Sequence, residues 1–157
     1  MLACRNLTES DCDFILAHWV GDSVVFRGGL SRSELSNMIQ QMNTKTHNGR
    51  YYEIFGIVHN TVLVGTFSFY QREIDFGEAV VYMGIEISSQ NRRKGFATQA
   101  IPIILAAAKG KGYKEIYTQV RVDNIASVHW HKRNGFTWLG ESLSAKGHKV
   151  YNYMYAL

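Results

Sequence analysis

At 157 residues and a formal net charge of +4, the chain has the length of one domain, so we expect residues 1–157 to form a single domain. Its 46% apolar and 19% charged residues are typical of a globular protein, and no apolar run approaches the roughly 20 residues that span a bilayer. Two cysteines exclude a disulfide framework, and the N-terminus lacks the apolar core of a signal peptide, so we expect a cytoplasmic protein without a membrane partner.

The N-terminal part predicts one short strand followed by two helices. Residues 3–7 form the predicted strand, and Thr8 to Asp11 supply N-cap chemistry for a helix over residues 11–19. A second helix begins at Ser31, because Ser31 and Glu34 have the spacing of a capping box. Its apolar residues follow helical periodicity and are Leu35, Met38, Ile39 and Met42.

From residue 51 the pattern changes to strands. Residues 51–59 and 61–72 are rich in aromatic and β-branched residues, and a junction at His59-Asn60 predicts a hairpin. A turn near Asp75 to Gly77 leads to a third strand over residues 79–88. One face of that strand is uniformly apolar and consists of Val81, Met83, Ile85 and Ile87.

The C-terminal part alternates helices and strands. A helix over 96–109, a strand over 114–122 and a helix over 124–134 precede a strand pair over 136–140 and 150–156. The first helix connects two strands as a parallel crossover, whereas the hairpins are antiparallel. The expected fold class is α/β (α+β), with a single mixed, mostly antiparallel sheet of about seven strands and helices on both faces.

The segment between the third strand and the following helix is the most informative part of the chain. Arg92, Arg93 and Lys94 are three consecutive cations, and Gly95 follows them. A helix start presents unpaired backbone N–H groups and the positive end of the helix dipole. We therefore expect the amides of residues 93–98 to hold a phosphate group. The alternative is a basic turn that is only solvated.

Two sequence patterns about 30 residues apart have to be considered together. The first pattern, Arg92-x-x-Gly95-x-Ala97, lies inside a strand–helix–strand unit. The residues of the second are Asn124, Ser127, Gly135 and Phe136. The pair resembles the acetyl-CoA motifs of the GNAT superfamily of N-acetyltransferases, and the expected element order is similar to that family's across essentially the whole chain. The chain looks most like the branch that acetylates ribosomal-protein N-termini and small amines.

The resemblance implies acetyl-CoA as a co-substrate and no metal. The 93–98 amides would hold the pyrophosphate, the edge of the 79–88 strand would pair with the pantetheine amides, and the Ile87 N–H would polarise the thioester carbonyl. Asn124 would bond to the pantetheine arm, or cap the following helix, or do both. The implied cofactor-binding residues are Ile85, Ile87, Arg92, Arg93, Lys94, Gly95, Phe96, Ala97, Thr98, Asn124 and Ser127.

The groups that move protons are less clearly marked. The family's usual tyrosine acid is replaced by His131, which is either a proton donor or a surface histidine beside Lys132. Three carboxylates are candidates for the base: Glu86 first, then Glu53, and Glu78 last. A chain of waters without a dedicated base is a further alternative.

We therefore expect an enzyme that moves an acetyl group from acetyl-CoA to a primary amine, on a protein N-terminus or a small molecule, by direct attack. The loop over residues 21–30 is in the region that shapes the acceptor site in this family. A non-catalytic CoA-binding or regulatory module of the same fold is the alternative. Nucleic acid is not favoured as a partner, because no reading motif accompanies the cations. A homodimer stays open.

Overall fold

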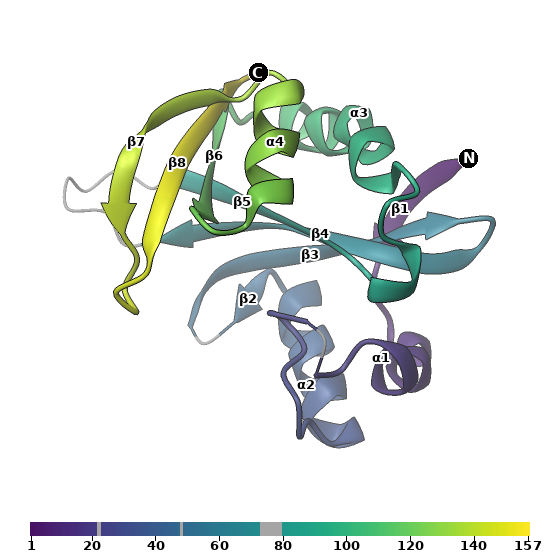
Figure 1. Cartoon of the computed structure of the whole chain (residues 1–157). Coiled ribbons are helices and arrows are strands. Elements are labelled where there is room, and N and C mark those ends of the chain that lie inside the picture. Colours follow the sequence, from purple (N-terminus) through teal and green to yellow (C-terminus); the bar gives the residue numbers. More distant parts are fainter. Residues whose placement is uncertain (22, 48, 73–79) are drawn as a thin grey trace.

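The protein is described by a computed structural model that covers residues 1–21, 23–47, 49–72 and 80–157 (Figure 1). Its strands are β1 (Leu2–Asn6), β2 (Thr46–His47), β3 (Arg50–His59), β4 (Val62–Arg72), β5 (Val80–Ile87), β6 (Glu115–Arg121), β7 (Thr137–Leu143) and β8 (Lys149–Ala156). They form an eight-stranded sheet in the order β1-β3-β4-β5-β6-β8-β7, with β2 paired to β3. Within the described residues β5 pairs with β6 in parallel and the other pairs are antiparallel, so the predicted mixed sheet is confirmed.

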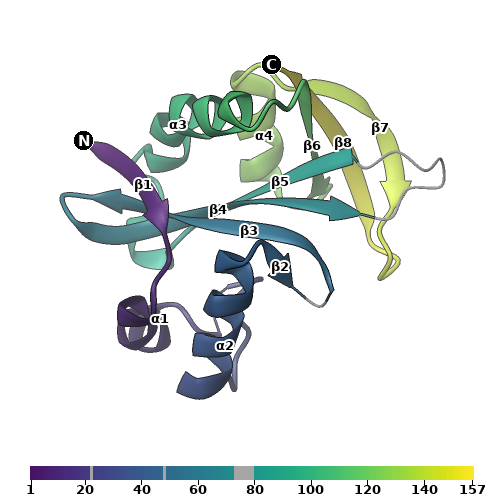
Figure 2. The ribbon, with the colours of Figure 1, turned by 180° about the vertical axis from the view of Figure 1, so that it is seen from behind.

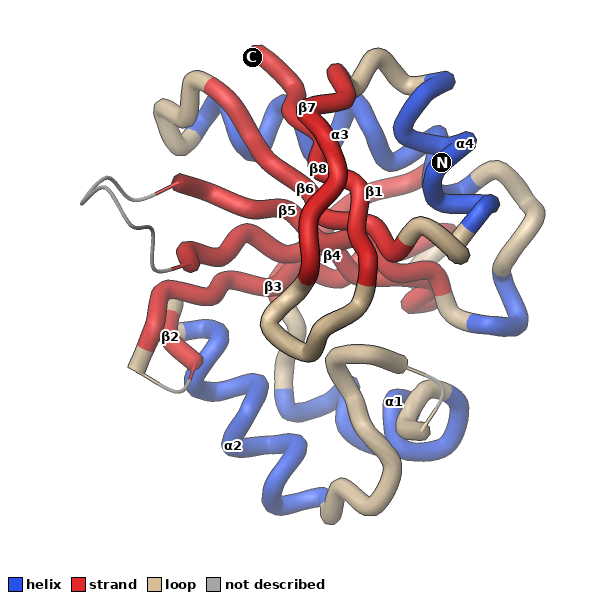
Figure 3. The backbone as a smooth tube through the Cα atoms, turned by 60° about the vertical axis from the view of Figure 1, so that its left-hand side comes forward, coloured by secondary structure: helices blue, strands red, loops and turns tan. Residues whose placement is uncertain are grey.

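Helices cover both faces of the sheet. In Figure 1, α3 (Phe96–Gly110) and α4 (Ile125–Arg133) lie above it, whereas α1 (Cys12–His18) and α2 (Arg32–Asn43) lie below it. The view from behind (Figure 2) and the tube coloured by secondary structure (Figure 3) show the same two layers of helices on either side of the sheet. Each layer has its own apolar core, and the apolar face predicted for the third long strand packs toward α3. The sheet thus separates one apolar core beneath α3 and α4 from a second one against α1 and α2.

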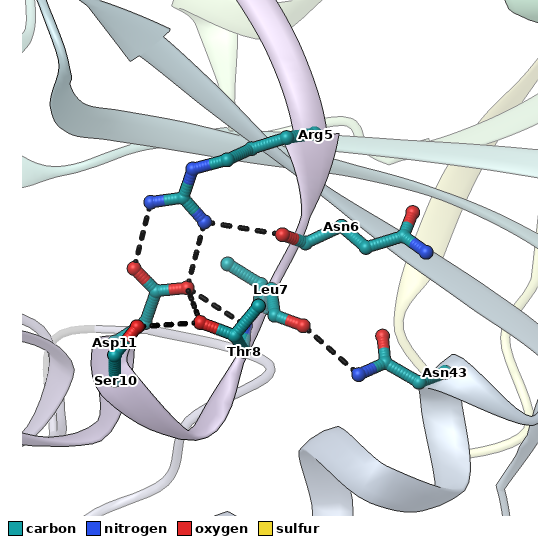
Figure 4. Close-up of polar contacts among 7 residues, drawn as sticks. All are labelled: Arg5, Asn6, Leu7, Thr8, Ser10, Asp11 and Asn43. Atoms are coloured by element: carbon teal, nitrogen blue, oxygen red, sulfur yellow. Dashed lines mark hydrogen bonds and ion pairs between the residues drawn. The ribbon is translucent and has the colours of Figure 1, made fainter.

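A partly buried ion pair between Arg5 and Asp11 joins the α1–α2 layer to the first strand (Figure 4). The Arg5 guanidinium donates two hydrogen bonds of 2.8 Å to the Asp11 carboxylate, which also accepts the Thr8 N–H at 2.8 Å. Burial alone would raise the pKa of Asp11, but the bonds from Arg5 and Thr8 outweigh it and lower that pKa. The Asn43 side-chain amide of α2 donates to the Leu7 carbonyl at 2.9 Å, which ties α2 to the segment that follows β1.

The hairpin between β3 and β4 turns through two residues with positive φ. Asn60 has a φ of 49° and Thr61 a φ of 70°, as a type I′ turn requires. The hairpin was predicted at His59-Asn60, and the turn lies one residue later. Asparagine tolerates this conformation, whereas a β-branched threonine is strained in it.

The remaining differences from the predicted elements are small. The Ser31 hydroxyl accepts the Glu34 N–H at 3.2 Å, so the predicted cap of α2 is confirmed. Strand β2 was not predicted, because two residues are too few for a periodic pattern. The turn expected near Asp75 to Gly77 and the candidate base Glu78 lie outside the described residues. Cys4 and Cys12 are both free thiols.

Candidate functional site

The central strands β5 and β6 separate toward their carboxyl ends. They pair in parallel at Tyr82 and Tyr117, and β5 then continues to Ile87 without a further described partner in β6. Strand β4 pairs with β5 along its whole length, so the edge that faces β6 is the open one. An open strand edge can pair with the amides of an extended ligand.

Two backbone amides of β5 point into the gap between β5 and β6. The Ser88 N–H donates to the Val64 carbonyl of β4 at 2.9 Å. By the alternation of an antiparallel pair, the backbone groups of Glu86 and Gly84 also point toward β4. Because backbone groups alternate sides along a strand, the N–H groups of Ile85 and Ile87 point the opposite way. Both residues were expected to contact the cofactor, and their backbone direction suits that role.

The chain turns from β5 into α3 through two left-handed residues. Arg93 has a φ of 62°, and Gly95, the N-cap of α3, has a φ of 80°. The first helical bond runs from the Gln99 N–H to the Gly95 carbonyl at 3.0 Å, and no side chain caps the helix. The N–H groups of residues 96–98 therefore have no acceptor within the helix. Glycine adopts the conformation at position 95 without strain.

Three exposed cations surround these amides. Arg92, Arg93 and Lys94 are all exposed, and the Arg92 Nε donates to the Ile87 carbonyl at 3.1 Å. Phe96 is buried and lies against His59, with ring centroids 5.0 Å apart, which anchors the first turn of α3. Backbone amides, the helix dipole and side-chain cations thus act at one place, as in known phosphate sites.

Helix α4 begins at the same edge of the sheet as α3. Because β5 and β6 are parallel, the helices that follow them both start at carboxyl ends of strands, and both lie on one face (Figure 1). Ligands of such sheets bind in the crevice outside these ends. The Asn124 side chain accepts the Ser127 N–H at 3.3 Å, so its role as a helix cap is confirmed.

The Glu86 carboxylate lies on the opposite face of β5, toward α1 and α2. The Ser23 hydroxyl donates to it at 3.0 Å, and the Trp19 indole N–H and the Val24 N–H face it at longer range. Burial raises the pKa of Glu86, and these donors and the charge of Arg92 offset only part of that effect. Glu86 therefore accepts a proton more readily than a surface glutamate does, as a general base must.

The loop before α2 is folded around Ser23. The N–H groups of Val25 and Phe26 donate to the Ser23 hydroxyl at 3.0 and 2.9 Å, and the Gly21 N–H donates to the Phe26 carbonyl at 2.9 Å. Trp19 and Phe26 are buried and form an edge-to-face pair beneath the loop. Ser23 was not predicted as a site residue. Its one signal was its position in the loop expected at the acceptor site.

Glu53 does not lie near Glu86 and the loop around Ser23. It lies on the α3 face of the sheet, where Lys111 Nζ donates to its carboxylate at 2.6 Å and the Tyr51 hydroxyl at 2.9 Å. The Tyr51 hydroxyl also lies 3.0 Å from that of Tyr113. A carboxylate held by an ion pair and a hydroxyl is already neutralised, so its surroundings favour a structural role.

His131 is buried in α4 among aromatic rings, so the alternative of a surface histidine is wrong. Its Nδ1–H donates to the Ser127 carbonyl at 2.7 Å, and the ring stacks on Tyr153 at 4.9 Å. Burial lowers the pKa of His131, and the bond to the carbonyl offsets this only in part, so the ring is neutral at pH 7. A neutral ring whose proton is held by a carbonyl is poorly placed to donate it.

None of the helices in the described ranges is long and apolar enough to cross a bilayer. In the same part of the chain, no three His, Cys, Asp or Glu side chains gather into a group that could hold a metal.

Several solved structures share this fold over nearly the whole chain. An acetyltransferase from Salmonella typhimurium that modifies the N-terminal serine of ribosomal protein L7/L12 is 21% identical, with 99% of this chain and 95% of that one covered and a TM-score of 0.75. The acetyltransferase yncA from the same organism, solved with its cofactor acetyl-CoA, is 15% identical, with 100% and 94% covered and a TM-score of 0.74. The spermidine/spermine N-acetyltransferase SpeG from Vibrio cholerae is 22% identical, with 99% and 92% covered and a TM-score of 0.72.

The TM-scores show a common fold, and at these low identities they show no more than the fold. The family is shown by the sequence itself. No curated protein matches the chain closely enough to count as a relative. The profile of the Acetyltransferase (GNAT) domain, however, matches residues 2–137. The match includes the strand β5, the basic bend and both helices that border the gap. The chain therefore belongs to the GNAT family of acetyltransferases.

Proposed function

We propose that the protein is a single-domain N-acetyltransferase that moves the acetyl group of acetyl-CoA to a primary amine by direct attack. The observation that carries the proposal is the open edge of β5, where the amides of Ile85 and Ile87 point into a gap that ends at the basic bend. An extended pantetheine arm with a pyrophosphate at one end matches this arrangement of amides and cations.

In this proposal the cofactor lies across the carboxyl ends of β5 and β6. The amides of residues 93–98 and the three cations hold the pyrophosphate, with Phe96, Ala97 and Thr98 as the first helical residues. Asn124 and Ser127 border the gap from the start of α4. The Ile87 N–H polarises the thioester carbonyl and stabilises the oxyanion that forms on attack.

Glu86 is the proposed general base. An aliphatic amine is mostly protonated at pH 7, so a proton must leave before the nitrogen can attack. Glu86 shares strand β5 with the amides at the gap, but its carboxylate lies on the other face, toward the loop around Ser23. The amine would approach from that loop, and the thioester would reach it through the gap between β5 and β6.

We propose no dedicated side-chain acid for the departing thiolate. A thiol ionises with a pKa of about 8.5, so its thiolate is a good leaving group without full proton transfer. His131 instead stabilises the start of α4, because it fixes the Ser127 carbonyl at the border of the gap. If it were the acid, replacing His131 with Asn would lower kcat and remove the loss of activity at high pH that deprotonation of the histidine causes. We expect this variant to lower stability instead, without a change in the pH profile.

The cofactor site is tested by one substitution at the two ends of α3. Gly95→Glu places a negative charge and a strained backbone at the bend, and we expect CoA affinity to fall at least about 100-fold by titration calorimetry. Gly110→Glu is the control, because a side chain at Gly110 meets open space at the far end of the helix. Equal CoA affinity of the two variants would contradict the proposed cofactor site.

A thiol-release assay with a panel of primary amines then separates an enzyme from a non-catalytic module. We expect amine-dependent release of CoA that Glu86→Gln suppresses. Binding of acetyl-CoA without release for any amine would support the alternative of a CoA-binding or regulatory module.

A further inference from the structure

A cavity of ≈ 460 Å³ lies between the loop before α2, the helix α2 itself and the strands β2 and β3. This volume is within the range of small-molecule sites. Most of its wall is apolar and consists of Val24, Val25, Leu30, Met38 and Met42. The cavity therefore suits a hydrocarbon body rather than a fully polar ligand.

The cavity adjoins the proposed base. Tyr52, which lines it, is on the α2 face of the sheet, as Glu86 is. Ser23, whose hydroxyl donates to Glu86 at 3.0 Å, directly precedes the lining residues Val24 and Val25. Val24 also lines the cavity, and its backbone N–H faces the Glu86 carboxylate. An amine at Glu86 would thus extend its body into this space.

Among the described lining residues, the charged group at pH 7 is a cation, Arg27. Arg27 and His47 line the cavity, and none of its described lining residues is a carboxylate. Burial lowers the pKa of His47, and the charge of Arg27 lowers it further, so His47 is neutral at pH 7 and Arg27 carries the positive charge of the wall. A second ammonium group of a ligand would meet a like charge here, whereas a carboxylate would meet an opposite one.

We infer that this cavity is the acceptor pocket and that its substrates are primary amines with an apolar body and a carboxylate at the far end, which Arg27 binds, rather than polyamines. The inference rests on the proposed function and names the acceptor class of the same site. The guanidinium of Arg27 in the cavity wall is what selects against a polyamine.

Matched acceptors of equal chain length test this selection. The value of kcat/KM is measured for the ω-amino acids aminobutanoate, aminohexanoate and aminooctanoate, in which the amine and the carboxylate are at opposite ends of the chain. It is also measured for the corresponding terminal diamines, and hexylamine serves as a reference without a second charged group. We expect the amino acid to be preferred over its diamine by at least about tenfold at one or more lengths, because a charge pair replaces a charge repulsion. A smaller preference at every length, or a preference for diamines, overturns the inference.

Charge reversal at Arg27 tests the residue itself. In Arg27→Glu we expect the ratio between amino acid and diamine to invert. Arg133→Glu makes the same charge change on an exposed residue in the last turn of α4, on the other face of the sheet, and should leave the ratio unchanged. An unchanged ratio in Arg27→Glu, or an equal change in both variants, overturns the inference.

A binding measurement keeps this result separate from the failure of the proposed function. Aminooctanoate and diaminooctane are titrated into the wild-type protein and Arg27→Glu, and binding is followed by calorimetry. Binding of aminooctanoate that Arg27→Glu abolishes supports the pocket even if no acetyl transfer occurs, in which case the proposed function alone fails. No binding and no turnover of aminooctanoate overturns the inference.

Discussion

Glu53 and Glu86 lie on opposite faces of the same sheet, and their surroundings differ in kind. Glu53 faces α3 and is held by Lys111 at 2.6 Å and by Tyr51 at 2.9 Å. Glu86 faces the loop before α2, where a single hydroxyl, that of Ser23, donates to it and no described cation forms an ion pair with it. The Glu53 carboxylate is paired with a cation, whereas the Glu86 carboxylate has a raised pKa and accepts a hydrogen bond from a hydroxyl.

Burial alone therefore did not decide which carboxylate we propose as the base. Glu53 is 7% exposed and thus more deeply buried than Glu86, yet it is engaged in an ion pair with Lys111. At Glu86 burial raises the pKa and its weaker partners do not fully compensate. The partner set, together with the face of the sheet, distinguishes the candidate base from the structural ion pair.

Replacing the candidate base should have the largest effect. Glu86→Gln keeps the shape of the side chain and its bond to Ser23 but removes the proton acceptor, so we expect kcat/KM to fall by about 10²–10⁴-fold. The Kd for acetyl-CoA should not change, because the proposed cofactor contacts, which are the amides of β5 and the basic bend, do not include the Glu86 side chain. Steady-state kinetics and calorimetry check both values. Activity within a few-fold of wild type would instead favour a water chain without a dedicated base.

The matching change at Glu53 should act on stability. Glu53→Gln leaves the Lys111 ammonium without its counter-charge in a partly buried site, and we expect the free energy of unfolding to fall by about 2 kcal/mol. Urea denaturation measures this loss, and kcat/KM at a temperature where the variant is folded should match wild type. A large loss of kcat/KM in the folded variant would return Glu53 to the list of candidate bases.

The pH profile sharpens the comparison further. The pKa of Glu86 is raised, and a base must be deprotonated, so kcat/KM should be highest above this pKa and fall about tenfold per pH unit below it. Ser23→Ala removes a hydrogen bond that lowers the pKa of Glu86, so the acid limb should move to higher pH. An acid limb that stays in place would show that another group controls it.

The smallest expected effect concerns the turn that helps to set the register of β3 and β4. Thr61 is a β-branched residue with a φ of 70°, and Thr61→Gly should raise the free energy of unfolding by up to about 1 kcal/mol. Asn60→Gly is the control, since asparagine already tolerates a positive φ and should change stability less. Thermal unfolding of both variants checks the difference, and a loss of stability in Thr61→Gly would contradict the strain argument.

Much of the fold follows from local signals. The capping residues before α2, the change from helical to strand periodicity at residue 51 and the glycine before α3 are short-range features, and each element they predicted is present. The bend at residues 92–98 was also predictable, because its cations and its glycine are contiguous in the sequence. Strand β2 was missed, since two residues carry no pattern.

The candidate site was only partly predictable. Glu86 was placed first among the bases because it shares a strand with the expected cofactor edge, and its raised pKa supports that ranking. Ser23 gave no signal, because a hydroxyl that reaches a carboxylate 63 residues away is a tertiary contact. Burial of His131 was also missed, since it depends on Tyr153 of β8 packing over α4.

The sequence by itself determined which elements form, where the basic bend lies and which residues share a face within each strand. It could not determine how the faces of different strands align, because a shift of one residue between paired strands moves every side chain to the other face. The register decided this: Glu53 is opposite Phe69 and Phe69 is opposite Met83, which places Glu53 on the face that Glu86 does not share. The separation of β5 from β6 is likewise tertiary, since it depends on where two distant strands stop pairing.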